Sequence, residues 1–132
     1  MGNDEVSLPL MSHPSFLGSH FMNSNHGLNH EIVLATLMRL SGADISVFPN
    51  YGGRFSFSKE ECTKIADSCR AKLGNMKPIF PSPGGGMTIE RIPEIATFFG
   101  KDTFLLIGGA LHRGNLLDNA KSLRTYVESL EN

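Results

Sequence analysis

Short apolar runs alternate with helical patterns four times along this 132-residue chain, and this alternation restricts the folds that it can adopt. The runs are Val6–Met11, Asp44–Pro49, Lys77–Pro81 and Asp102–Ile107. Each is hydrophobic nearly throughout, which is typical of parallel strands that are covered by helices on both faces. Four consecutive βα units therefore predict an α/β fold with a parallel sheet and right-handed crossovers.

Helical patterns follow each run, over about 29–40, 58–73, 89–99 and 116–130. Ser58 and Glu61 form an S-x-x-E capping box at the start of the second pattern. Glycines are expected to end the first three helices, at Gly42, Gly74 and Gly100. The last helix has a regular apolar face, which consists of Leu116, Ala120, Leu123, Val127 and Leu130.

Two architectures fit four βα units. One is a small doubly wound sheet, and the other is half of a (β/α)8 barrel, since a complete barrel needs about 250 residues. In both, functional groups collect at the carboxyl ends of the strands. This chain places glycines and polar residues after each of its four runs.

Composition narrows the classes of function. The net charge is -1, charged residues make up 19%, and no Lys/Arg-rich run is present. These properties argue against nucleic acid or an anionic membrane as the main partner, and no apolar run approaches the roughly 18 residues of a membrane span. Cys62 and Cys69 lie about two helical turns apart, too far for a disulfide. We expect buried thiols in a cytoplasmic protein.

Two glycine-rich loops, Gly84–Gly86 and Gly108–Gly109, follow the third and fourth runs. Glycines let backbone N–H groups approach an anion closely, and a helix N-terminus adds partial positive charge. Barrel phosphate sites commonly follow strands seven and eight. These loops predict a phosphate site, and the alternative is that the glycines only permit tight turns.

Two side chains are candidates for chemistry. His13 directly follows the first run and could transfer a proton or bind substrate. Arg54 lies in a Gly-Gly loop and could close over an anion. A structural histidine and a solvated arginine are the alternatives. His20, His26 and His30 lack the spacing of zinc ligands, so we predict no metal site and assign them to loops or a helix start.

Several segments, in this order, resemble the large-subunit barrel of RuBisCO, and more closely the RuBisCO-like proteins of form IV. They are 39–44, 52–55, 85–86, 92–94, 99–102 and 107–109. The resemblance implies the C-terminal half of a TIM barrel, from strand five to helix eight, as one partial domain over residues 1–132. It also implies that His13 matches an active-site histidine and that Gly84, Gly85, Gly86, Gly108 and Gly109 match the loops that hold a substrate phosphate.

The departures from RuBisCO affect substrate contacts. Arg54 stands in the mobile loop six where RuBisCO has a lysine that stabilises the carboxylation transition state, and arginine is not an equivalent donor. Pro14, Val47 and Gly84 replace an arginine, a histidine and a serine. The resemblance therefore implies chemistry through an enediolate on a phosphorylated sugar or sugar acid, of decarboxylase, hydrolase or enolase type, rather than CO₂ fixation. Segments 13–16 and 48–55 look more like the decarboxylases and hydrolases than the enolases. A stand-alone phosphate-binding domain without catalysis is the alternative.

The resemblance also implies groups that this sequence lacks. The family holds Mg²⁺ with a carbamylated lysine and two acidic residues after strand two, a cluster with no counterpart here. Without that metal the isolated chain is expected to be inactive. A half-barrel has two open sheet edges, so the expected partners are the missing N-terminal half-barrel or a second copy. The full-length family is typically homodimeric.

Overall fold

Three parallel strands form the sheet of this computed structural model, which describes residues 7–15, 17–21, 23, 25–55 and 57–130. The strands are adjacent in chain order and are β1 (Met11–Ser12), β2 (Ile45–Pro49) and β3 (Phe80–Gly84). Met11 pairs with Ile45, and Ile45 pairs with Phe80. The predicted α/β fold with a parallel sheet is confirmed.

The fourth predicted strand, 102–107, is not confirmed as a strand. Within the described residues it contributes one parallel bridge, between Leu106 and Gly84, and the amide of Phe104 donates to the carbonyl of Pro81 over 3.0 Å. Proline has no N–H to donate. The main-chain groups of Ser82 and Gly84 point towards β2, so those of Pro81 and Pro83 point towards the segment 102–107. Neither proline can donate a main-chain hydrogen bond to that segment.

The predicted start of the first strand was also too early. Val6 lies outside the described residues, and pairing with β2 begins at Met11. Leu10 is joined to the sheet by its carbonyl, which accepts from the amides of Asp44 and Ile45. The apolar run is therefore longer than the segment that forms a strand.

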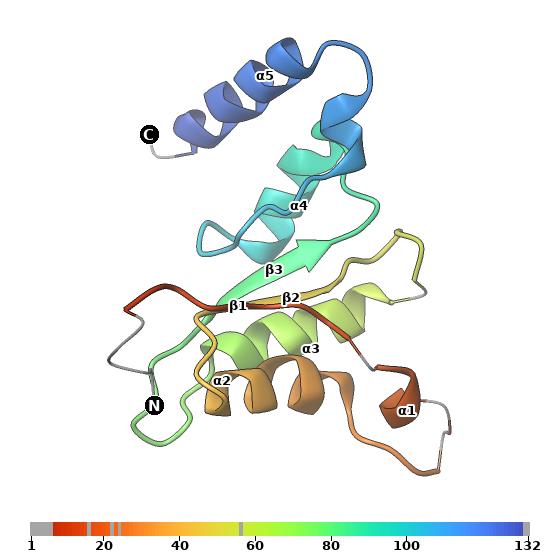
Figure 1. Cartoon of the computed structure of the whole chain (residues 1–132), viewed down its shortest axis with the longest axis vertical. Coiled ribbons are helices and arrows are strands. Elements are labelled where there is room, and N and C mark those ends of the chain that lie inside the picture. Colours follow the sequence, from red (N-terminus) through yellow and green to blue (C-terminus); the bar gives the residue numbers. More distant parts are fainter. Residues whose placement is uncertain (1–6, 16, 22, 24, 56, 131–132) are drawn as a thin grey trace.

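The helices follow the predicted order (Figure 1). They are α1 (Gly18–Phe21), a π-helical segment (Ile32–Leu37), α2 (Met38–Leu40), α3 (Lys59–Arg70), α4 (Ile92–Phe99) and α5 (Leu116–Ser129), with 3-10 turns at Ile89–Arg91 and Gly109–His112. The capping box of Ser58 and Glu61 is present in full, and Gly100 is the C-cap of α4 as predicted. In the described part of the chain, no helix is long and apolar enough to cross a membrane.

The end of α3 differs from the prediction. The helix stops at Arg70, and Gly74 comes too late to be its C′ residue. Arg39 is 2% exposed and fills the space beyond the helix end. Its guanidinium donates to the carbonyl oxygens of Ala71, Met76 and Lys77, each over 2.6 Å. These bonds satisfy main-chain acceptors of the segment that follows the helix.

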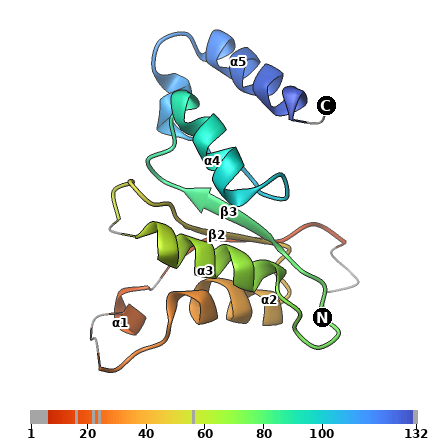
Figure 2. The ribbon, with the colours of Figure 1, turned by 180° about the vertical axis from the view of Figure 1, so that it is seen from behind.

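The core lies between the sheet and the π-helical segment, α3 and α4. Figure 2 shows α2, which continues the π-helical segment, side by side with α3. Phe48 of β2 and Ile65 of α3 are fully buried within it. Cys62 and Cys69 are buried free thiols, as predicted. Burial raises the pKa of Cys62 to about 11 and that of Cys69 to about 12, so both thiols stay protonated.

Candidate functional site

A cavity of about 550 Å³ opens at the carboxyl ends of the parallel strands. His13 lies in its wall after β1, and Gly84 and Gly85 lie there at the end of β3. The remaining wall is mainly apolar and comes from Pro14, Leu17, Phe21, Val47, Phe48, Pro49, Phe55, Phe57 and Leu106, together with Gly18 and His30. An apolar cavity with a few convergent polar groups is the usual form of a small-molecule site.

The structure brings together only some of the predicted site residues. His13, Gly84 and Gly85 line this cavity, whereas Arg54, Gly86, Gly108 and Gly109 are not among its lining residues. Arg54 is exposed, and its guanidinium carbon lies 6.0 Å from the ring centroid of Phe55, which does line the cavity. The roles assigned to all seven residues remain predictions.

Packing explains one of the glycines without a ligand. A Cβ on Gly86 would come within 2.6 Å of the backbone Cα of Gly53, whereas a Cβ on Gly84 would come within 2.9 Å of the end of the Leu106 side chain, which can move aside. Gly85 differs, because its φ is +87° and nothing lies within 4 Å of where its Cβ would be. Its backbone is therefore open to the cavity that it lines.

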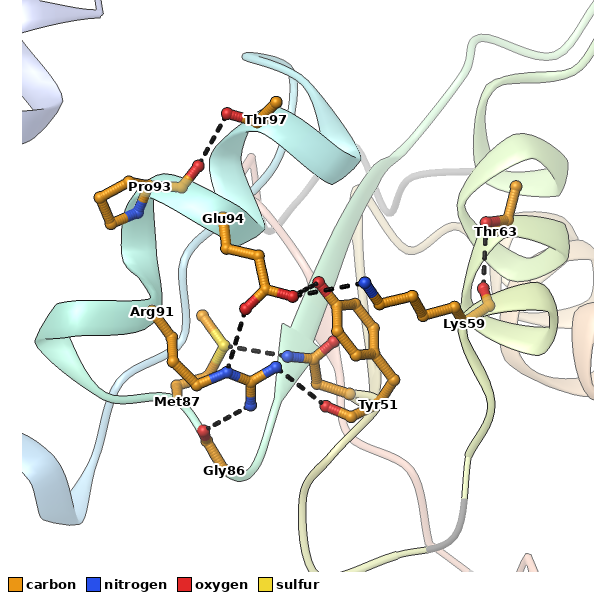
Figure 3. Close-up of polar contacts among 10 residues, drawn as sticks. Tyr51, Lys59, Thr63, Gly86, Met87, Arg91, Pro93, Glu94 and Thr97 are labelled. Atoms are coloured by element: carbon orange, nitrogen blue, oxygen red, sulfur yellow. Dashed lines mark hydrogen bonds and ion pairs between the residues drawn. The ribbon is translucent and has the colours of Figure 1, made fainter.

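A polar network ties the loop after β2 to the glycine loop after β3 (Figure 3). The hydroxyl of Tyr51 donates to Glu94 Oε1 over 2.8 Å, and the ammonium of Lys59 lies 3.5 Å from the same oxygen. Arg91 donates to the carbonyl of Gly86 over 3.0 Å and to that of Tyr51 over 3.4 Å. These contacts fix the two loops that border the cavity relative to each other.

The same network sets the protonation states of its members. Burial and the neighbouring carboxylate of Glu94 raise the pKa of Tyr51 to about 12. The hydrogen bond from Tyr51 lowers the pKa of Glu94, and the positive charge of Arg91 acts in the same direction. Tyr51 is therefore a donor and Glu94 an ionised acceptor at neutral pH.

The described residues do not fit the Mg²⁺ site that the resemblance implies. Among them, no group of three or more His, Cys, Asp or Glu side chains is placed to hold a metal ion. Mg²⁺ needs oxygen ligands in a near-octahedral arrangement. No catalytic step through a metal can be derived from these residues.

His30 and Glu61 form a pair that the sequence did not predict. His30 is the first helical residue of its segment, as expected, but it also lines the cavity. Its Nδ1 lies 2.9 Å from Oε1 of Glu61, which the sequence marked only as a capping residue. The two residues are far apart in the sequence, so no local pattern connects them.

Comparison with known proteins identifies the relatives, although no family model matches the chain. It is 41% identical over 111 residues to the ribulose bisphosphate carboxylase-like protein 1 of Rhodopseudomonas palustris, a match that covers 84% of this chain and 28% of that protein. It is 30% identical over 110 residues to a 2,3-diketo-5-methylthiopentyl-1-phosphate enolase of Bacillus cytotoxicus, covering 83% of this chain and 27% of that protein.

A solved structure shows the same relationship in three dimensions. The RuBisCO-like protein of Alicyclobacillus acidocaldarius superposes with a TM-score of 0.86 at 30% identity, covering 98% of this chain and 33% of that one. The chain thus spans about a third or less of the length of the relatives that it matches. In sequence and in fold the chain is therefore of the RuBisCO-like type, as its motifs predicted.

Proposed function

We propose that residues 1–132 correspond to the region from strand five to helix eight of a RuBisCO-like barrel, and that their cavity holds a phosphorylated sugar or a ketone derived from one. One observation carries this proposal. His13, Gly84 and Gly85 come from separate parts of the chain and meet in one cavity at the carboxyl ends of parallel strands. Barrel enzymes place their active sites at that end.

The chemistry that we propose is enolisation through an enediolate, rather than CO₂ fixation. Pro14, Val47 and Gly84 line the cavity at positions where the resemblance to RuBisCO expects polar side chains. The named enolase relative favours the enolase type over a decarboxylase or hydrolase. Its substrate name includes a methylthio group, and such a group would suit the apolar wall formed by residues such as Phe55 and Phe57.

A complete active site requires a partner in this proposal. Apolar side chains of the sheet and of the segment beside it are exposed, namely Met11 at 48%, Phe80 at 44%, Phe104 at 44% and Leu106 at 39%. Surface of this kind marks an interaction site. We assign it to the N-terminal half of the barrel, or to a second copy of the chain, within a protein that is homodimeric as in the family. That half would also supply the Mg²⁺ ligands.

A second candidate function is phosphate-ligand binding without catalysis. It is favoured by the lack, among the described residues, of any cluster that could hold a metal. Both functions share the same anion site and differ only in the chemistry that follows binding. Of the two experiments that follow, the first tests the shared anion site and the second separates the two functions.

The anion site is tested by titrating the chain with inorganic phosphate. Gly85→Ala should weaken binding by tenfold or more, because the added methyl group lies over the backbone of the cavity wall. Gly74→Ala is the matched control: Gly74 also has positive φ (+55°) and open space around it, but it is not a cavity residue. Gly108→Val extends the test to the second loop, where a Cβ also meets nothing within 4 Å. Equal affinity for phosphate in all four proteins would remove the assignment.

Catalysis is tested by combining the chain with the N-terminal segment of a RuBisCO-like relative and Mg²⁺. The reconstituted sample should exchange deuterium from solvent into a phosphorylated ketone at the carbon next to its carbonyl. A folded complex that binds phosphate and gives no exchange would contradict the enolase proposal and support the binding function.

A further inference from the structure

His30 lies in the wall between two cavities. Its ring lines the cavity described above and also a neighbouring polar pocket of about 420 Å³, to which Glu61 and Lys64 contribute. The ring centroid is 4.1 Å from that of Phe21 on one side and 4.5 Å from that of Phe57 on the other. These two aromatic contacts fix the plane of the imidazole.

Glu61 fixes how the imidazole ring is turned within this plane. Its Oε1 lies 2.9 Å from Nδ1 of His30, and its Oε2 accepts a hydrogen bond from the backbone amide of Ser58 over 2.8 Å. The bond from the Ser58 backbone, with the nearby His30, holds the pKa of Glu61 below its usual value. An ionised carboxylate only accepts, so in the neutral imidazole Nδ1 carries the hydrogen and Nε2 carries a lone pair.

Nε2 is the atom that His30 can offer to a ligand. Nδ1 is occupied by Glu61, which lines the polar pocket but not the larger cavity. Among the described residues, no hydrogen bond or ion pair to Nε2 is present. The rest of the wall is mainly apolar, and a polar atom that stays unpaired in such a place costs free energy. Nε2 therefore favours ligands that carry a hydrogen-bond donor.

We propose that His30, oriented by Glu61, accepts a hydrogen bond from a hydroxyl group of the phosphorylated ligand and thereby selects hydroxylated over deoxy compounds. This inference rests on the proposed function, because the phosphate must first bind in the same cavity. It makes His30 a specificity-determining residue and Glu61 a positioning residue. A site built to pair with a hydroxyl rejects an analogue that lacks it.

The test compares glycerol 3-phosphate with propyl phosphate, which has the same carbon skeleton without hydroxyl groups, and uses inorganic phosphate as a reference. The chain should bind glycerol 3-phosphate about threefold to tenfold more tightly than propyl phosphate, the range for one net hydrogen bond. His30→Phe preserves an aromatic ring between Phe21 and Phe57 and removes both nitrogens. It should bring the ratio close to one and leave the affinity for inorganic phosphate unchanged.

Glu61→Ala removes the group that holds Nδ1 and should reduce the ratio, whereas Glu60→Ala, at the exposed neighbour that pairs with Lys64, should not. Glu61→Gln can still hold Nδ1 and should keep the ratio, because a ligand hydroxyl can either donate to Nε2 or accept from it. NMR of the imidazole nitrogens gives an independent readout: in the neutral ring the hydrogen should lie on Nδ1, and glycerol 3-phosphate should shift the Nε2 resonance.

Each outcome separates this inference from the proposed function. If phosphate binds but His30→Phe retains the preference, or the unmodified chain has none, the role of His30 is wrong and the anion site stands. If inorganic phosphate does not bind at all, the anion site is wrong and the role of His30 is lost with it.

Discussion

The central part of the chain and its last helix use their apolar residues very differently. All five residues of β2 are buried, and α3 buries Cys62, Ile65, Ala66 and Cys69. The last helix, α5, is longer, at 14 residues against 12, and has a regular apolar face, yet none of its residues is buried. In Figure 1 it lies at the far end of the molecule, beyond α4.

This difference shows what an amphipathic pattern does and does not establish. The pattern of α5 correctly predicted a helix, and its start at Leu116 was correct. Only Leu123 and Tyr126 of this helix pack against the core, however, while Leu116 and Leu117 are 48% and 59% exposed. Most helical stability in proteins comes from packing, so α5 should be less stable than α3.

The largest expected effect is in the central region. Phe48→Ala removes a fully buried ring from the centre of the core and should lower the free energy of unfolding by about 3–5 kcal/mol. Urea denaturation followed by circular dichroism measures the change. A loss below about 1 kcal/mol would mean that β2 does not form the core of the protein.

Alkaline pH should destabilise the protein through Tyr51. Its pKa is raised from 10.0 to about 12, so the unfolded chain releases this proton first as pH rises. The stabilisation is complete below pH 10 and is lost as pH rises towards 12, with about 1 kcal/mol lost by pH 11. Denaturation at pH 9 and 11 should show the loss in the unmodified chain. Tyr51→Phe should remove this loss of stability at high pH, whereas Tyr126→Phe in α5 should leave it unchanged.

The N-caps of α3 and α5 allow the stability of the two regions to be compared by equivalent substitutions. Ser58→Ala breaks the capping box of α3 and should cost about 1 kcal/mol of global stability. Asn115 caps α5 by accepting from the amides of Leu117 and Asp118. Asn115→Ala should instead loosen α5 locally, which hydrogen exchange of its amides would detect. Equal global losses would indicate that α5 unfolds together with the core.

The smallest expected effect concerns the exposed face of α5. Leu117→Ala should change the free energy of unfolding by no more than about 0.5 kcal/mol, because the side chain is 59% exposed. Thermal denaturation of the isolated chain measures this. In the reconstituted complex a larger loss would show that the missing half of the barrel covers this surface.

The candidate site was predicted in part. His13, Gly84 and Gly85 were identified because they follow strands, and the structure places them in one cavity. The three Gly84–Gly86 positions were treated as one phosphate loop, but the close approach of Gly53 explains Gly86 by packing alone. The pair of His30 and Glu61 was missed, since it depends on how a loop and α3 meet.

The sequence by itself determined the parallel α/β order, the start of α5, the capping box at Ser58 and the RuBisCO-like motifs. These follow from signals within a few residues or from a linear pattern. Only the tertiary structure decided that Pro81 and Pro83 face the edge beside 102–107, that Arg39 closes the end of α3 and that α5 buries no residue. Each of these depends on contacts between distant segments, which hydrophobic periodicity does not specify.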